Sequence, residues 1–246
     1  MQQLMQAMRQ RVAAQEQSDF IRYLRDETIE PYRRLSSWFS CAAPFVFGFK
    51  DLNTFVFNYP EEQAQTDRFK RMINNHCLED ANHWPMYLQS LQALELDGKQ
   101  KFSDTLTFLW GPQTQQQRYA AYRFAQLADR LQAPLQRYCL IETIELFASH
   151  LFGIVAQISS AYSAAGAAGA AGAAGAAGAP SPDYLSPIHA QKEPGILVNQ
   201  QGGSLQQELM QTVLDDASRA AVMPALQEVC ELIERRWQEF YDVSAR

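Results

Sequence analysis

The sequence predicts a soluble all-α protein, folded as a single antiparallel helical bundle over residues 1–246. Hydrophobic residues recur every three or four positions over long stretches, which is the spacing of helices that bury one face. Alternating strand patterns bounded by turn dipeptides are absent from the sequence. With 246 residues, 47% of them hydrophobic, the chain can bury one substantial core.

Helical periodicity places the expected helices in order along the chain. Their ranges are roughly 18–39, 66–95, 115–131, 134–160, 183–192 and 204–243. Gly111 and Pro112 separate the second helix from the third, and Pro134 suits the first turn of the fourth. The last range fits either one helix or two helices that are separated near Pro224.

A tract rich in glycine and alanine interrupts the domain. From Ser163 to Ala179 a glycine recurs at every third residue, and each glycine costs a helix about 1 kcal/mol relative to alanine. Residues 163–181 are therefore expected to form a flexible loop within the bundle. The repeat is brief and contains no proline, so collagen-like assembly is not expected.

Composition narrows the functional class and the location. A net charge of -6 without a basic stripe argues against a nucleic-acid partner. The N-terminus lacks the apolar run of a signal peptide, and the apolar stretch Leu146–Ile158 is too short to cross a bilayer, so no membrane segment is expected. The four cysteines are widely spaced, which favours reduced thiols and a cytoplasmic protein over disulfides or a zinc site.

Four ionisable side chains recur on what should be the buried stripe of the second helix: His76, Glu79, Asp80 and His83. At about 100° per residue they fall within roughly 100° of arc. Buried charges need partners, water or a cation, because leaving them unpaired costs several kcal/mol. A metal or catalytic site is the favoured interpretation, although a lone buried histidine is usually structural.

The fourth helix carries two carboxylates in an otherwise apolar sequence. Glu142 and Glu145 share one face with Tyr138, where either a metal or a salt bridge to Arg123 or Arg137 would satisfy them. His150 points away from Glu142 and is expected to be structural. In the fifth helix His189 and Glu193 are four residues apart and would face the same way.

These segments together resemble the heme-oxygenase-like superfamily, which includes the TenA thiaminases, the pyrroloquinoline quinone synthesis oxidase and the non-heme di-iron oxidases. The resemblance covers roughly residues 60–243 and is carried mainly by the block HCLEDANHWPMYLQSLQAL. It implies an iron centre, with a di-iron site as the full form. The departure is Ile196, which stands where the last ligand helix of the oxidases has a histidine, and it implies an incomplete second metal site.

The leading functional hypothesis is a non-heme iron oxidase or oxygenase acting on a small organic substrate. The resemblance implies these metal ligands: Asp80, His83, Glu142, His189 and Glu193. Further ligands or orienting groups would be His76, Glu79 and Glu145, and pocket walls would be Trp84, Tyr138 and Phe152.

Two alternatives remain open. One is a thiaminase-like hydrolase with Cys139 as nucleophile, and the other is a binding module without catalysis, which Ile196 favours. Acidic, aromatic-rich helices would also suit a homodimer.

Overall fold

The computed structural model describes residues 1–170, 183–186 and 211–245, and among these residues every regular element is helical. The α-helices are α1 (Gln2–Ala14), α2 (Asp19–Arg25), α3 (Pro31–Phe39), α4 (Ala43–Asp51), α5 (Glu61–Thr66), α6 (Arg68–Asp80), α7 (Trp84–Ala93), α8 (Phe102–Trp110), α9 (Gln115–Arg130), α10 (Pro134–Ala170) and α13 (Asp216–Ser244). A π-helical segment, η3 (Leu52–Phe57), and short 3-10 turns such as η5 (Asp183–Leu185) connect them. The predicted all-α class is confirmed.

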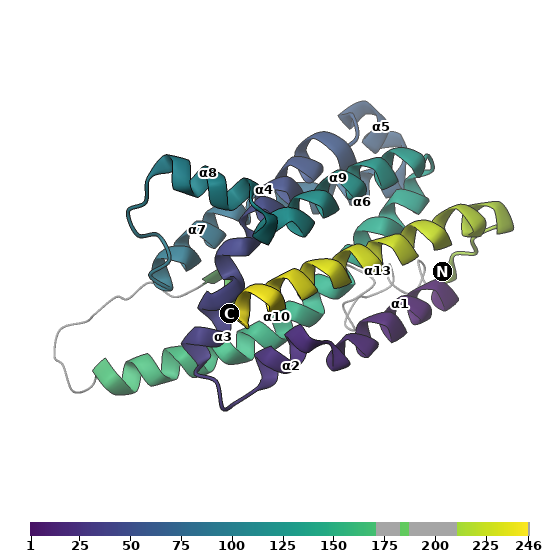
Figure 1. Ribbon diagram of the computed structural model, residues 1–246. Helices are drawn as coiled ribbons and strands as arrows, with labels where there is room; N and C mark the ends of the chain where they lie inside the picture. Colours follow the sequence, from purple (N-terminus) through teal and green to yellow (C-terminus); the bar gives the residue numbers. More distant parts are fainter. Residues whose placement is uncertain (171–182, 187–210, 246) are drawn as a thin grey trace.

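Helix α10 forms the centre of the bundle. It contacts α13, α3, α1 and α6, and α13 in turn contacts α9, α2 and α3 (Figure 1). In Figure 1, α10 and α13 lie side by side and run in the same direction, whereas α9 runs the opposite way. The antiparallel arrangement predicted for the bundle therefore holds for α9 but not for the α10–α13 pair.

Helix α10 is longer and more apolar than the sequence analysis anticipated. Its segment Pro134–Ala164 is long and apolar enough to cross a membrane by length and composition. In the folded chain 67% of its most apolar window is buried by other parts of the protein. A core helix of a soluble protein has the same properties, and the packing of α10 matches that description.

Side-chain caps explain where several helices begin. Ser18 Oγ accepts a hydrogen bond from the backbone N–H of Ile21 at the start of α2, and Asp67 caps α6 in the same manner. At α13 the carboxylate of Asp215 accepts from the backbone N–H of Ser218. Such caps satisfy backbone donors that the helix itself leaves without partners.

Prolines divide two helices that were predicted as single ones. Range 18–39 forms α2 and α3, with Pro31 at the start of α3, and range 66–95 forms α6 and α7, with Pro85 in the first turn of α7. Proline disfavours helix continuation from the preceding residues, so the chain turns before it. Pro224, by contrast, lies inside the continuous helix α13, so the alternative of a break there is wrong.

Helices α1, α4, α5 and α8 were not predicted, and other boundaries differ from the sequence analysis. Helix α10 continues to Ala170, so the first residues of the glycine-alanine tract are helical, while the rest of the tract lies outside the described residues. Of the predicted helix 183–192, the described part is a 3-10 turn. The last helix, α13, begins at Asp216, and residues 204–210 of the predicted range lie outside the described residues.

Helix α4 packs closely against α9 through a glycine. A Cβ atom built on Gly48 would lie 2.9 Å from the Cβ of Ala121, closer than carbon atoms normally approach. Phe45 and Phe49, on the same helix, line the internal pocket described below. The contact at Gly48 therefore helps to position one wall of that pocket.

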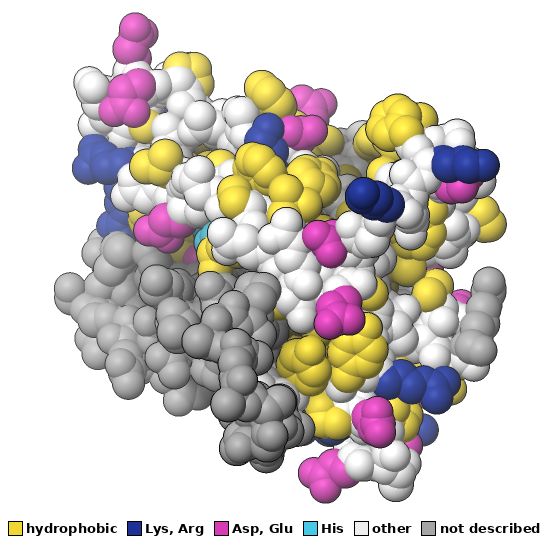
Figure 2. Space-filling view, turned by 90° about the vertical axis from the view of Figure 1, so that its left-hand side faces the viewer, with side chains coloured by type: hydrophobic (Ala, Val, Ile, Leu, Met, Phe, Trp, Pro, Cys, Tyr) yellow, Lys and Arg dark blue, Asp and Glu magenta, His cyan; other side chains and the backbone are white. Residues whose placement is uncertain are grey.

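The surface carries charges of both signs. On the face drawn in Figure 2, lysine and arginine side chains are interspersed with aspartate and glutamate, with hydrophobic side chains between them.

Candidate metal centre

Three side chains from α6 and α10 converge in the interior. His76 Nε2 lies 2.8 Å from Asp80 Oδ2 and 3.7 Å from Glu145 Oε1, and one ligand atom from each residue lies within 4.8 Å of the others. The carboxylates are largely buried, with 9% of the Asp80 side chain and 4% of the Glu145 side chain exposed. Two buried carboxylates so close together need positive charge, from a protonated histidine or from a metal ion.

Local sequence explains how α6 presents this pair. His76 and Asp80 are one turn apart on the same face, beside the buried residues Ile73 and Cys77. Asp80 is the last residue of α6, because the chain turns ahead of Pro85. A carboxylate at a helix C-terminus is disfavoured by the helix dipole, so a nearby cation would relieve this repulsion.

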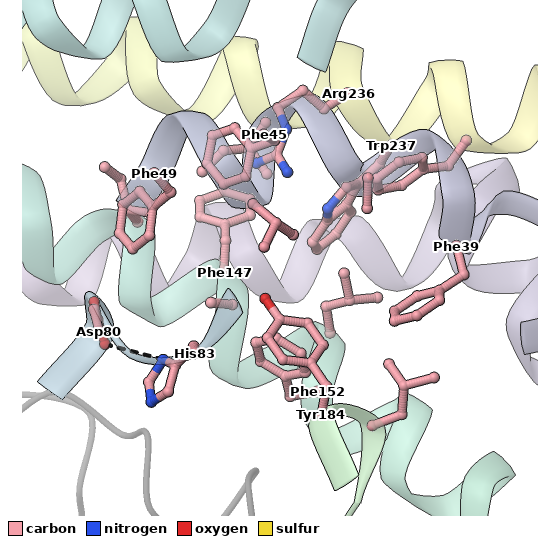
Figure 3. Close-up of a pocket in the computed structure, with 18 of the residues that line it drawn as sticks. Phe39, Phe45, Phe49, Asp80, His83, Phe147, Phe152, Tyr184, Arg236 and Trp237 are labelled. Atoms are coloured by element: carbon pink, nitrogen blue, oxygen red, sulfur yellow. Dashed lines mark ion pairs between the residues drawn. The ribbon is translucent and has the colours of Figure 1, made fainter. Parts of the chain in front are cut away.

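His83 joins the edge of the cluster from the turn between α6 and α7. Its Nδ1 atom lies 3.5 Å from Asp80 Oδ1, as the dashed line in Figure 3 shows. Because α6 ends at Asp80, His83 does not continue the helical stripe on which the sequence analysis placed it. The side chain is 26% exposed, more than those of Asp80 and Glu145.

Two predicted participants lie elsewhere. Glu79 is exposed, contrary to the predicted buried stripe, because it is rotated by roughly 110° from the centre of the buried face of α6. Glu142 is buried but is not part of the three-residue cluster within the described chain. It precedes Glu145 by roughly 4.5 Å along the α10 axis. Its carboxylate accepts a hydrogen bond from the hydroxyl of Tyr138.

The salt-bridge alternative for the two glutamates receives no support from the arginines proposed for it. Arg123 pairs with Glu228 on α13, and Arg137 donates to the backbone oxygens of Val56 and Ala128. The predicted ligands His189 and Glu193 lie outside the described residues, as does Ile196.

His150 has the structural role predicted for it. Its Nε2 atom lies 3.4 Å from Glu16 Oε1, and its ring stacks near Trp237 at a centroid distance of 6.3 Å. Burial lowers the pKa of His150, which Glu16 partly counteracts. No described ligand cluster includes this residue.

The nucleophile of the hydrolase alternative is poorly placed for attack. Cys139 is fully buried in α10, with its thiol 3.8 Å from the sulfur of Met1. Burial, together with the charge of Glu142, raises the pKa of the Cys139 thiol to about 12. A thiol nucleophile needs the opposite shift, so the structure gives no support to cysteine catalysis.

An apolar pocket of about 100 Å³ adjoins the cluster. Asp80, His83 and Glu145 form part of its lining, and aromatic rings from α3, α4, α10 and α13 form much of the rest (Figure 3). Of the predicted pocket residues, Trp84 and Phe152 line it. Tyr138 does not: it packs near Phe69 and donates to Glu142 instead.

The sequence analysis missed Arg236, Phe45 and Tyr184, all of which line this pocket. Arg236 lies in the run Glu234–Arg235–Arg236, which looks like a solvated charge cluster in the sequence. The helical period was the available signal, since Ile233, Trp237 and Phe240 share its face of α13 and are buried.

Comparisons of this sequence with models of known protein families and with curated proteins gave no match.

Proposed function

We propose that this chain is a metal-dependent oxidase or oxygenase that binds iron through His76, Asp80 and Glu145 and accepts a small organic substrate in the adjoining pocket. The observation that carries the proposal is the convergence of one imidazole and two buried carboxylates, within 4.8 Å of one another, at the wall of an apolar pocket. A few convergent polar groups at the wall of an apolar pocket are a common mark of a functional site.

The donor set fits iron. Carboxylate oxygens and imidazole nitrogen are ligands of iron in helical bundles, where they project inward from facing helices. Here α6 contributes two donors and α10 contributes one. Iron bound at these residues would supply dioxygen activation, and the resemblance to heme-oxygenase-like oxidases agrees with that chemistry.

The residues around the cluster would support such a reaction. His83, at 3.5 Å from Asp80, can orient that carboxylate or hold a proton beside it. The aromatic walls make the space in front of the donors largely apolar. A second iron would draw on Glu142, His83, His189 and Glu193, and this di-iron form remains part of the proposal.

Metal analysis of the full-length protein tests the proposal. After expression with iron supplementation and gel filtration, the wild-type protein is expected to contain at least one iron per chain. Asp80→Asn and Glu145→Gln should lower metal affinity by at least about 100-fold, since even groups outside the ligand set often contribute 10–100-fold. Glu16→Gln is the matched control, because Glu16 pairs with Arg25 and His150, neither of which belongs to the cluster. Equal metal content in all four proteins, or none in the wild type, would contradict the proposal.

A second function, small-molecule binding without metal, is favoured by one distance. His76 Nε2 and Asp80 Oδ2 are 2.8 Å apart, so a protonated His76 would offset one of the two carboxylate charges without a metal ion. In that case the protein would bind organic ligands equally well with and without iron. Oxygen consumption in the presence of a bound ligand and iron separates the two functions.

A further inference from the structure

A buried arginine faces the pocket from the side opposite the metal cluster. Arg236, on α13, lines the pocket with only 8% of its surface exposed. Its guanidinium carbon lies 3.2 Å from the centre of the Phe45 ring, so the charge is held against an aromatic wall. Figure 3 draws Arg236 on the far side of the pocket from Asp80 and His83.

The guanidinium is only partly satisfied by the protein. Within the described chain it donates one hydrogen bond, from Nε to Gln117 Oε1 at 2.8 Å. The nearby acid, Glu239, is engaged elsewhere: its oxygens accept from the backbone N–H groups of Gln116 and Gln117 and from the Gln117 side chain. No carboxylate of the described residues forms a salt bridge with Arg236.

Such an arrangement is costly unless an anion completes it. Burial lowers the pKa of Arg236 to about 9, which shows how strongly the surroundings disfavour the charge. A planar guanidinium with free terminal N–H groups matches the two oxygens of a carboxylate. The other basic residue of the lining, Lys50, lies 3.2 Å from Asp51, so it is already neutralised.

The space between Arg236 and the cluster is suited to an apolar body. The rings of Phe147, Phe152 and Trp237 line it, and Tyr184 projects a hydroxyl group among them (Figure 3). A pocket of about 100 Å³ whose wall holds one guanidinium without a salt-bridge partner among the described residues favours a compact monoanion over a phosphate dianion.

We propose that the occupant of this pocket is a small amphipathic carboxylic acid, whose carboxylate binds Arg236 and whose apolar chain or ring lies on the aromatic walls. The opposite end of the molecule then reaches Asp80, His83 and Glu145. This inference rests on the proposed function in taking the pocket as the substrate site, and it adds the class of substrate and the residue that orients it.

Paired ligands test this inference on the metal-free full chain. 3-Phenylpropionate and hexanoate are compared with 3-phenylpropionamide and hexanamide, which have the same size but no charge. Binding is measured by calorimetry and by the fluorescence of Trp38, Trp84 and Trp237, which line the pocket. The carboxylates are expected to bind at least about 10-fold more tightly than the amides, as a buried charged hydrogen bond warrants.

Two variants assign that preference to the arginine. Arg236→Met should bind carboxylate and amide with equal affinity, and Arg236→Lys, which keeps the charge, should retain part of the difference. Asp80→Asn should keep the full preference while losing metal, so failure of the metal proposal and failure of this one are distinguishable. Equal affinities in the wild-type protein, or an unchanged preference in a folded Arg236→Met, would overturn the inference.

Discussion

Asp80 connects the candidate metal centre to the pocket. Its two oxygens face different histidines, with Oδ2 at 2.8 Å from His76 and Oδ1 at 3.5 Å from His83. The same side chain lines the pocket. A single carboxylate at the end of α6 thus couples the charge of the cluster to whatever occupies the apolar space.

Replacing His76 tests the cluster one residue at a time. Addition of Co²⁺ or Fe²⁺ should raise the melting temperature of the wild-type protein, because a ligand at 100 times its dissociation constant contributes about 2.7 kcal/mol. His76→Ala should abolish this shift. His150→Ala, which removes a histidine paired with Glu16, should preserve it. A metal-dependent shift that survives in His76→Ala would place the bound metal elsewhere.

The buried thiol of Cys139 gives a second test at the scale of a residue. With its pKa raised to about 12 by burial, Cys139 should resist alkylation by iodoacetamide at pH 8 in the folded protein and react rapidly in urea. Mass spectrometry of the tryptic peptide measures the difference. Rapid labelling of the native protein, with loss of hydrolytic activity, would instead support Cys139 as a catalytic nucleophile.

Prolines determine much of the element structure. Pro31 is the first residue of α3 and Pro85 lies in the first turn of α7, and the position of Pro85 decides where α6 ends and where His83 lies. Both prolines are visible in the sequence. The apolar periodicity continues across the α2–α3 and α6–α7 boundaries, however, so these boundaries were not predicted. Periodicity succeeded at α9 and at the start of α10, where no proline interrupts the pattern.

Other elements were missed for a different reason. Helix α4 is apolar nearly throughout its length, and α8 has no buried residue, so neither shows a clear division into buried and exposed faces. Helix α1 is rich in glutamine and buries only a narrow stripe of residues. These helices are fixed by tertiary contacts that a single sequence does not display.

Pro224 offers a test of helix energetics. It lies exposed inside α13, where it cannot donate to the carbonyl of Ala220. Pro224→Ala should raise the free energy of unfolding by about 1–3 kcal/mol, measured by urea denaturation. Pro31→Ala is the matched control: proline is favourable at the first position of α3, so this change should give no gain. A destabilised Pro224→Ala would show that the ring makes contacts worth more than the missing hydrogen bond.

Across the whole molecule, the sequence indicated which residues could form the candidate site but not how they come together. The helical stripe identified His76 and Asp80, and the buried carboxylates of α10 pointed to Glu145. Pairing across helices depends on how α6 and α10 meet, which periodicity within each helix does not specify. For the same reason nothing in the sequence placed Arg236 opposite the cluster.

Because all four cysteines are buried, the free energy of unfolding is expected to fall at alkaline pH. Their pKa values rise from 9.0 to about 12 for Cys41, Cys77 and Cys139, and to about 11 for Cys230, chiefly through burial. The unfolded chain therefore releases these protons first, so stability is complete below pH 9 and declines as the pH rises from 9 toward 12. The slope is about 1.4 kcal/mol per pH unit for each thiol.

Urea denaturation at pH 8 and pH 10 measures this decline. Cys139→Ala should lose less stability between the two pH values than the wild-type protein, because one of the titrating groups is gone. An identical loss in both proteins would show that groups other than this thiol dominate.

The lack of a side chain at Gly48 affects the width of the pocket. A methyl group there would collide with Ala121 and act as a wedge between two helices, and the relief open to α4 is to move inward with Phe45 and Phe49. The pocket would narrow at the wall formed by Phe45 and Phe49. One methyl group at Gly48 would thus shift the preference of the pocket from bulky molecules toward slender ones.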